Sequence, residues 1–138
     1  MESIMKYLLS ISIILSFSFG QWPTSPDNPL WLGDGVQAQV RATSDGGAYV
    51  AWLSDGNYHV YLQRLNSDGE PQWSNGGMVV SDQPNSSWIA VHHMNLAVDG
   101  NDNAIISTLD TRTGIWQVYA YKIAPDGSIP WGADGLAL

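Results

Sequence analysis

Cysteine is absent from the 138 residues, which excludes disulfide frameworks and zinc sites built on cysteine ligands. Basic residues are scarce: five Lys and Arg stand against 13 Asp and Glu, and the net charge is −8. That balance argues against a nucleic-acid partner and against binding to an anionic membrane surface. Strong helix formers are few and helix breakers are spread along the chain, so a helical bundle is disfavoured.

Turn-forming residues are abundant instead. Most aspartates stand beside glycine or asparagine, as in segments 44–47, 55–57, 68–69, 99–103 and 126–127. Asp and Asn side chains close turns by accepting hydrogen bonds from nearby backbone N–H groups, and glycine tolerates positive φ. The acidic composition is therefore interpreted as repeated turn chemistry and not as an acidic active site.

Residues 1–20 have the features of a secretory signal peptide. Lys6 supplies a positive charge, residues 8–19 are apolar apart from serines, and Ser18 and Gly20 are small residues before a cleavage site. The apolar run is too short to span a bilayer, which needs about 20 helical residues; a buried core helix is the alternative interpretation. We expect a mature protein that starts near Gln21, is secreted or at the cell surface, and does not insert in the membrane after cleavage.

An internal repeat organises the remaining chain. Residues 58–73 read YHVYLQRLNSDGEPQW, and residues 116–131 read WQVYAYKIAPDGSIPW. The repeat-defining pairs, 58 positions apart, are Tyr61 and Tyr119, Asp68 and Asp126, Gly69 and Gly127, and Trp73 and Trp131. A third, partial copy begins at Trp31, because all three tryptophans are followed four residues later by glycine and then by an apolar residue.

The pattern of apolar residues between turns predicts β-strands at Val36–Ala42, Ala48–Leu53, 58–65, 78–80, 89–98, 103–109 and 115–123. We therefore predict an all-β fold of antiparallel, propeller-blade-like β-repeat units. Two units, at about 31–80 and 81–138, and a partial one form a β-repeat domain over 21–138. Since propellers usually have at least four blades, we expect this domain to be a fragment of a larger array.

Both faces of the strand at 58–65 carry large apolar groups. Alternate residues share a face, so Tyr58, Val60 and Leu62 lie on one side and Tyr61 and Leu65 on the other. A sheet that is apolar on both sides is typical of stacked repeat sheets.

Residues 61–80 resemble repeats of secreted and surface proteins of Bacteroidota, which follow the pattern YxQRLxxDGxxxWxxxGxxV. This resemblance covers nearly all of the mature chain and implies export and a β-propeller-like array of four-stranded sheets. It implies no particular chemistry. The second copy has Tyr121 and Lys122 where the first has Gln63 and Arg64, so these positions are not a fixed site.

A weaker similarity links the repeats to the Asp boxes of sialidase propellers. Asp68 and Asp126 precede Trp73 and Trp131 by five residues, as in an Asp box, but the flanking Ser or Thr and Gly of that motif are missing. We interpret the repeat as a hairpin in which Asp organises the turn and Trp packs beneath it. Trp31, Trp73 and Trp131 are therefore expected in the core or between units.

The sequence contains few residues that match known catalytic motifs. Glycoside hydrolysis needs two carboxylates roughly 5–10 Å apart, and Glu70, the one glutamate after the signal peptide, lies in a polar turn. Neither a nucleophile elbow nor a phosphate-binding glycine loop is present. Neighbours on a strand point to opposite faces, so His92 and His93 are interpreted as structural and not as metal ligands. No catalytic residue, metal site or cofactor is predicted.

One segment, residues 99–110, matches part of the calcium-binding loop pattern. Asp99, Asn101, Asn103 and Asp110 occupy positions 1, 3, 5 and 12 of a calcium-loop pattern. Position 6, which should be glycine, is Ala104, and the segment aligns with a strand in the first unit. A plain strand-to-strand turn is the favoured interpretation.

Aromatic residues are the remaining candidates for ligand contact. Trp88 does not repeat and follows a polar segment, so its ring could stack on a sugar. Tyr58 and Trp116 occupy equivalent positions beside a hairpin tip and are the next candidates.

These observations favour an exported, non-enzymatic β-repeat module for surface display, adhesion or glycan contact. Its expected partner is a glycan or a surface protein, and open sheet edges predict self-association. The alternatives are a truncated Asp-box-type glycoside hydrolase and a purely structural spacer.

Overall fold

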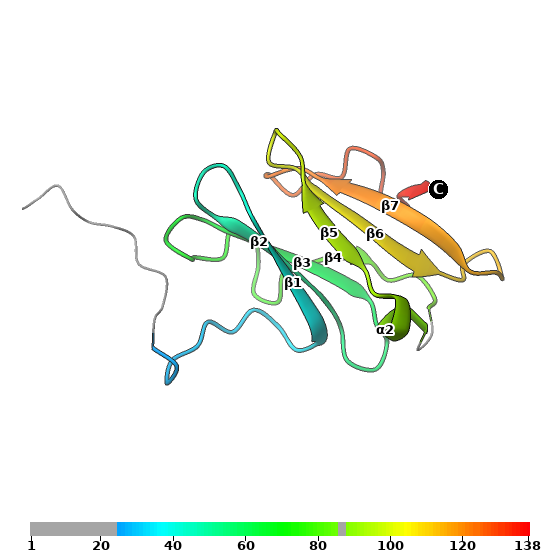
Figure 1. Cartoon of the computed structure of the whole chain (residues 1–138), viewed down its shortest axis with the longest axis horizontal. Coiled ribbons are helices and arrows are strands. Elements are labelled where there is room, and N and C mark those ends of the chain that lie inside the picture. The colour runs from blue at the N-terminus through cyan, green and yellow to red at the C-terminus, as the bar shows by residue number, and fades with distance from the viewer. Residues whose placement is uncertain (1–24, 86–87) are drawn as a thin grey trace, which may run out of the picture.

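Two four-stranded antiparallel sheets make up the computed structural model, which describes residues 25–85 and 88–138 (Figure 1). The first sheet contains β1 (Val36–Ala42), β2 (Ala48–Leu53), β3 (Val60–Leu65) and β4 (Met78–Ser81). The second contains β5 (Asn95–Val98), β6 (Ala104–Asp110), β7 (Gln117–Ile123) and β8 (Leu136–Ala137). Within each sheet, every strand pairs with the next one along the chain, so the prediction of an antiparallel all-β fold is confirmed. The expected signal peptide lies outside the described residues.

The connection between the sheets differs from the sequence prediction. The prediction of a strand over 89–98 is wrong in its first half, which belongs to the helix α2 (Trp88–His92). The N–H of His93 bonds the carbonyl of Ile89 at 2.8 Å, and His93 has a left-handed φ of 62°, which ends the helix. This turn allows both Ile89 and Met94 to be buried. No helix in the two described ranges is long and apolar enough to cross a membrane.

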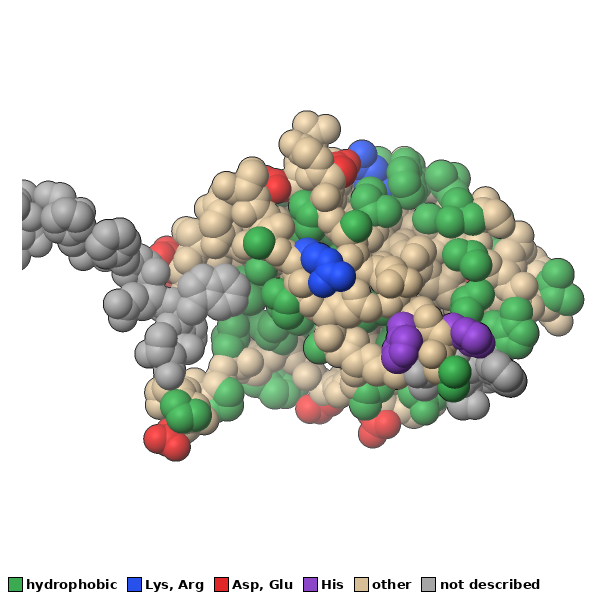
Figure 2. Space-filling model, in the orientation of Figure 1, with side chains coloured by type: hydrophobic (Ala, Val, Ile, Leu, Met, Phe, Trp, Pro, Cys, Tyr) green, Lys and Arg blue, Asp and Glu red, His purple; other side chains and the backbone are tan. Residues whose placement is uncertain are grey.

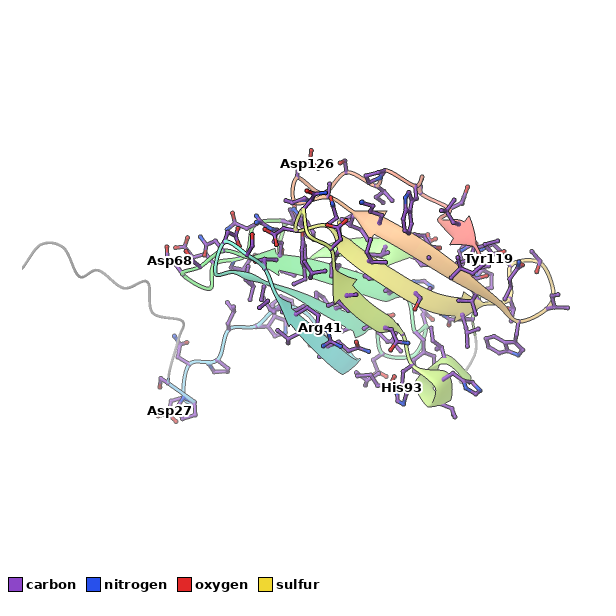
Figure 3. The ribbon with its side chains drawn as sticks, turned by 45° about the horizontal axis from the view of Figure 1, so that its top comes forward. Asp27, Arg41, Asp68, His93, Tyr119 and Asp126 are labelled. Carbon is purple, nitrogen blue, oxygen red and sulfur yellow. The ribbon has the colours of Figure 1, made fainter. Side chains whose placement is uncertain are left out.

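Aspartate side chains close most of the tight turns, as expected. Asp45, Asp99 and Asp126 each accept a hydrogen bond from the backbone N–H two residues further on, at 2.9 to 3.1 Å. In the turn after β3, however, Asn66 has this role and accepts from the N–H of Asp68 at 3.0 Å. The expected turn-organising role of Asp68 is therefore wrong; its side chain is exposed. Asp68 and Asp126 lie at the end of the molecule away from His93 (Figure 3).

The main core lies between the two sheets. The first sheet contributes Tyr49, Ala51, Leu53, Val60 and Leu62, and the second sheet with its preceding helix contributes Ile89, Met94, Leu96, Ala104, Ile106, Tyr119, Tyr121 and Ile123. Burying a large apolar side chain stabilises the fold by roughly 1.5–3 kcal/mol. The edges of the two sheets are also joined, because Gln39 of β1 bonds the carbonyl of Met94 and, at 3.1 Å, the N–H of Leu96.

The repeat places equivalent residues on different surfaces. Each sheet has two sides, which we name by their repeat positions. Face one of the first sheet carries residues 49, 51, 53, 60 and 62, and face one of the second sheet carries their repeat counterparts 105, 107, 109, 118 and 120. Face two is the opposite side. The first sheet contributes face one to the core, whereas the second sheet contributes face two. The sheets are thus stacked in the same sense, face one against face two.

Candidate functional site

The non-repeated segment and two hairpin tips meet at one end of the molecule. We call this region the tip end: the β2–β3 tip (54–59), the β6–β7 tip (111–116), segment 82–85 and α2 (Figure 1). Asn85 donates to the carbonyl of Tyr58 at 2.8 Å. The N–H and hydroxyl of Thr111 both donate to the carbonyl of Pro84, at 2.8 and 3.0 Å. The segment therefore holds the two hairpin tips together.

A buried ion pair stiffens the β6–β7 tip. The carboxylate of Asp110 is almost fully buried and accepts from Nη2 of Arg112 at 2.6 Å and from its Nε at 3.0 Å. The guanidinium also donates to Tyr121 Oη at 2.6 Å and to the carbonyl of Asp134 at 2.7 Å, and it lies 3.7 Å from the ring centroid of Tyr119. The hydrogen bond to Asp110 raises the pKa of Arg112 above its ordinary value, so the guanidinium stays charged.

The calcium pattern is not assembled. Asp99 precedes β6 and Asp110 ends it, so the two carboxylates lie at opposite ends of a seven-residue strand. Asp99 bonds turn N–H groups and lies 2.9 Å from Lys122 Nζ, and the hydrogen bond from that ammonium holds the pKa of Asp99 well below its usual range. No group of three His, Asp or Glu side chains in the described part of the chain is placed to hold a metal ion.

The three aromatic candidates have different environments. Trp116 immediately precedes β7 and is 41% exposed. Tyr58 is partly buried against the core between the sheets, which leaves little of its ring for a ligand. Trp88 is the first residue of α2, but its side chain lies outside the described part of the structure. Trp116 is therefore the candidate whose position suits ligand contact.

The repeated tryptophans are not equally buried. Trp73 packs against the core, with its ring centroid 5.9 Å from that of Tyr49. Trp31 and Trp131 are 61% and 37% exposed, so the expectation of core packing is wrong for these two. The reason is their place in the stack. The second sheet covers Trp73, and the described residues contain no further sheet that could cover the other two.

The remaining repeat positions are structural. Tyr61 stacks on Trp52 on face two of the first sheet, with centroids 5.8 Å apart. Its counterpart Tyr119 is buried beneath Arg112. Gly69 and Gly127 have φ of 79° and 85°, which their turns require.

The histidine pair borders a shallow cavity. His92 ends α2 and His93 follows it, both exposed, and His93 Nδ1 lies 3.0 Å from Gln37 Oε1. Because this segment is helical, the expectation that the two side chains occupy opposite faces of a strand is wrong. The cavity has a volume of about 160 Å³ and lies over face one of the second sheet; its lining includes His92, His93, Asn95, Ser107, Leu109 and Val118.

No family model, curated protein or solved structure matches the chain. The side chains of the tip end and of the adjoining Asp110 define the chemistry available there. The buried carboxylate that adjoins the tip end, Asp110, is neutralised by Arg112, and the same hairpin carries the exposed indole of Trp116. This arrangement suits the binding of a ligand with apolar and polar faces more than acid–base chemistry.

Proposed function

We propose that the chain is an exported, non-enzymatic β-repeat module that contacts a glycan through the tip end. The exposed Trp116 carries this proposal, because an indole offers a flat apolar surface to the C–H face of a sugar ring while its N–H remains able to donate. The bonds of Pro84 and Asp110 to the adjacent tip fix the hairpin in place. A preorganised tip loses less conformational freedom on binding.

The state of the carboxylates supports binding over hydrolysis. A glycoside hydrolase needs an acid whose pKa is raised above its usual range. Turn hydrogen bonds instead lower the pKa of Asp45 and Asp126, and the hydrogen bond from Lys122 lowers that of Asp99. Asp110 is occupied by Arg112.

Export and surface location rest on residues 1–20 and on the resemblance to Bacteroidota repeat proteins. The repeat itself supports a scaffold role, since two stacked sheets form a rigid body on which a hairpin tip can be displayed.

Calorimetric titration of the purified chain with a panel of neutral and acidic oligosaccharides tests the proposal. We expect saturable binding without release of a reducing end. Trp116→Ala should weaken binding about fivefold, since loss of an aromatic contact costs about 1 kcal/mol. The matched control is Ile115→Ala, which removes an exposed apolar neighbour in the same tip and should leave affinity unchanged. Hydrolysis of any glycan would favour the enzyme alternative, and no binding to any of them would favour the spacer.

A further inference from the structure

We infer that copies of this chain stack head to tail, with face one of the second sheet of one copy against face two of the first sheet of the next. The internal interface supplies the template. It joins face one of the first sheet to face two of the second, and each sheet has one face that is not used in this way. The partner is therefore a second copy, held in the arrangement that already joins the two sheets.

Face one of the second sheet keeps an apolar character although nothing in the described structure covers it. Val60 and Met78 on the first sheet are buried or packed against the core, and their counterparts Val118 and Leu136 are 38% and 45% exposed. Ile105 and Leu109 are only half-buried, at positions where the first sheet has the fully buried Tyr49 and Leu53. Hydrophobic side chains gather over β6 and β7 (Figure 2). An exposed apolar patch of this kind marks an interaction surface.

Face two of the first sheet is the complementary surface. Its centre is formed by Val50, Trp52 and Tyr61, which Leu32 covers in part. Val40 and Val79, paired in register with Val50 and Tyr61, remain exposed at either side. A cavity of about 230 Å³ opens beside Trp52 between residues 30–35 and this face. The face therefore still has apolar surface and a hollow for an incoming sheet.

Trp131 supplies a second, independent observation. Its counterpart Trp73 is covered by the turn at Gly127 of the next sheet, where a Cβ would lie 3.4 Å from the indole nitrogen. In a head-to-tail stack, the turn after β3 of the following copy, in which Ser67 and Asp68 are exposed and Gly69 is buried, takes the place of the turn at Gly127. The exposed Trp131 would then lie against this turn.

The joint between copies lacks the polar links of the internal interface. Inside the chain, Asp102 accepts from Tyr49 and from the N–H of Ser44. In the joint between copies, Ile105 stands in place of Tyr49 and Gly46 in place of Asp102. Ile105 has no hydroxyl group, so the bond that Tyr49 makes cannot form there. Association is therefore apolar, weaker than the internal stacking and dependent on concentration, and salt should not dissociate it. A face-one-to-face-two contact is heterologous, so it forms rings or open fibres.

Sedimentation velocity of the purified chain over a range of concentrations tests the inference. We expect the average mass to rise with concentration and to persist in high salt. A chain that stays monomeric at every concentration overturns it. Two variants, Val118→Lys and Val79→Lys, each block one of the two faces at an exposed position, so folding is preserved and each should be monomeric alone. Val91→Lys, on the exposed side of α2, is the control and should associate like the unchanged chain.

Mixing the two blocked variants decides the geometry. Each keeps the face that the other lacks, so the mixture should form a dimer although neither variant does so alone. A symmetric dimer through face one alone would instead leave Val79→Lys dimeric and the mixture without a new species, which overturns head-to-tail stacking. Trp116 lies on face one of the second sheet, where a stacked copy would cover it as the core covers its counterpart Tyr58, so stacking and glycan contact compete for it. Val79→Lys leaves face one and Trp116 unchanged, so glycan titration of this monomeric variant separates a failure of the proposed function from a failure of stacking.

Discussion

The hydroxyl group of Tyr49 in β2 donates a hydrogen bond of 2.9 Å to the backbone carbonyl of Asp102, in the turn between β5 and β6. Tyr49 is fully buried, and this burial raises its pKa to about 12. Asp102 has a left-handed φ of 58°, and its carboxylate accepts from the N–H of Ser44 at 2.8 Å. The β5–β6 turn is thereby bonded to Tyr49 and to Ser44 of the first sheet. Because the phenol of Tyr49 must be protonated to donate, the contact between the sheets depends on its protonation.

Alkaline pH should therefore weaken the fold. The pKa of Tyr49 is raised from 10.0 to about 12 on folding, so its contribution to stability is complete below about pH 10 and is lost as pH rises through 12. The free energy of unfolding, measured with denaturant at several pH values, should fall over this window. Tyr49→Phe should be less stable by about 1 kcal/mol at neutral pH, since the hydrogen bond is lost, and its alkaline decline should be smaller. An equal decline in both proteins would contradict this account.

Acidic pH should act at the turns. Folding lowers the pKa of Asp99 below 3.8, chiefly because Lys122 donates a hydrogen bond to it. The resulting stability is present above about pH 4 and is lost as pH falls further. Asp99→Asn should therefore show a shallower acid decline in the free energy of unfolding. Lys122→Gln leaves the carboxylate but removes its largest stabilising partner, so its decline should lie between those of the other two proteins. A decline as steep in Asp99→Asn as in the unchanged chain would count against this assignment.

The sequence predicted most of the sheet because its signals are local. Asp-Gly turns and alternating apolar residues place β1 and β2 at their observed bounds, since each signal needs only a few neighbouring residues. The same logic failed at α2. There the run from Ile89 to Met94 fits a strand by its apolar content, and only the left-handed backbone at His93 and the burial of both ends reveal the helical turn.

The candidate site was predictable only in part. Trp116 was found because it occupies a repeat position beside a hairpin tip, which a sequence displays. Its difference from Tyr58 was not predictable, because exposure depends on which face of each sheet the next sheet covers. The role of Arg112 was missed for a similar reason. Its partners Tyr121 and Asp134 are nine and 22 residues away in the sequence, and only the Asp110–Arg112 spacing was a local signal.

Two equivalent glycines should be intolerant of a side chain. Gly77 and Gly135 have φ of 72° and 67°, and a Cβ would lie 2.6 Å from the carbonyl oxygen of Leu62 and 2.8 Å from that of Ala120. Gly77→Ala and Gly135→Ala should each lower the free energy of unfolding by about 2 kcal/mol or more, from the left-handed backbone together with the clash. Gly76→Ala is the matched control, because φ is 87° but no atom lies within 4 Å. It should cost about 1 kcal/mol, and an equal cost at Gly76 and Gly77 would show that the close approach is not limiting.

The Asp110–Arg112 pair should be more important as a pair than as two separate charges. Arg112→Met leaves the buried carboxylate of Asp110 without its counter-charge, which should lower the free energy of unfolding by about 3–5 kcal/mol. Asp110→Asn combined with Arg112→Met removes both charges, so the double variant should be more stable than Arg112→Met alone. Arg112→Lys keeps the charge but not the two-pronged contact with the carboxylate, and it should lie between the unchanged chain and Arg112→Met. Denaturant unfolding of the unchanged chain, Asp110→Asn, Arg112→Met and the double variant measures the coupling, and additive effects of the two substitutions would contradict a buried, mutually dependent pair.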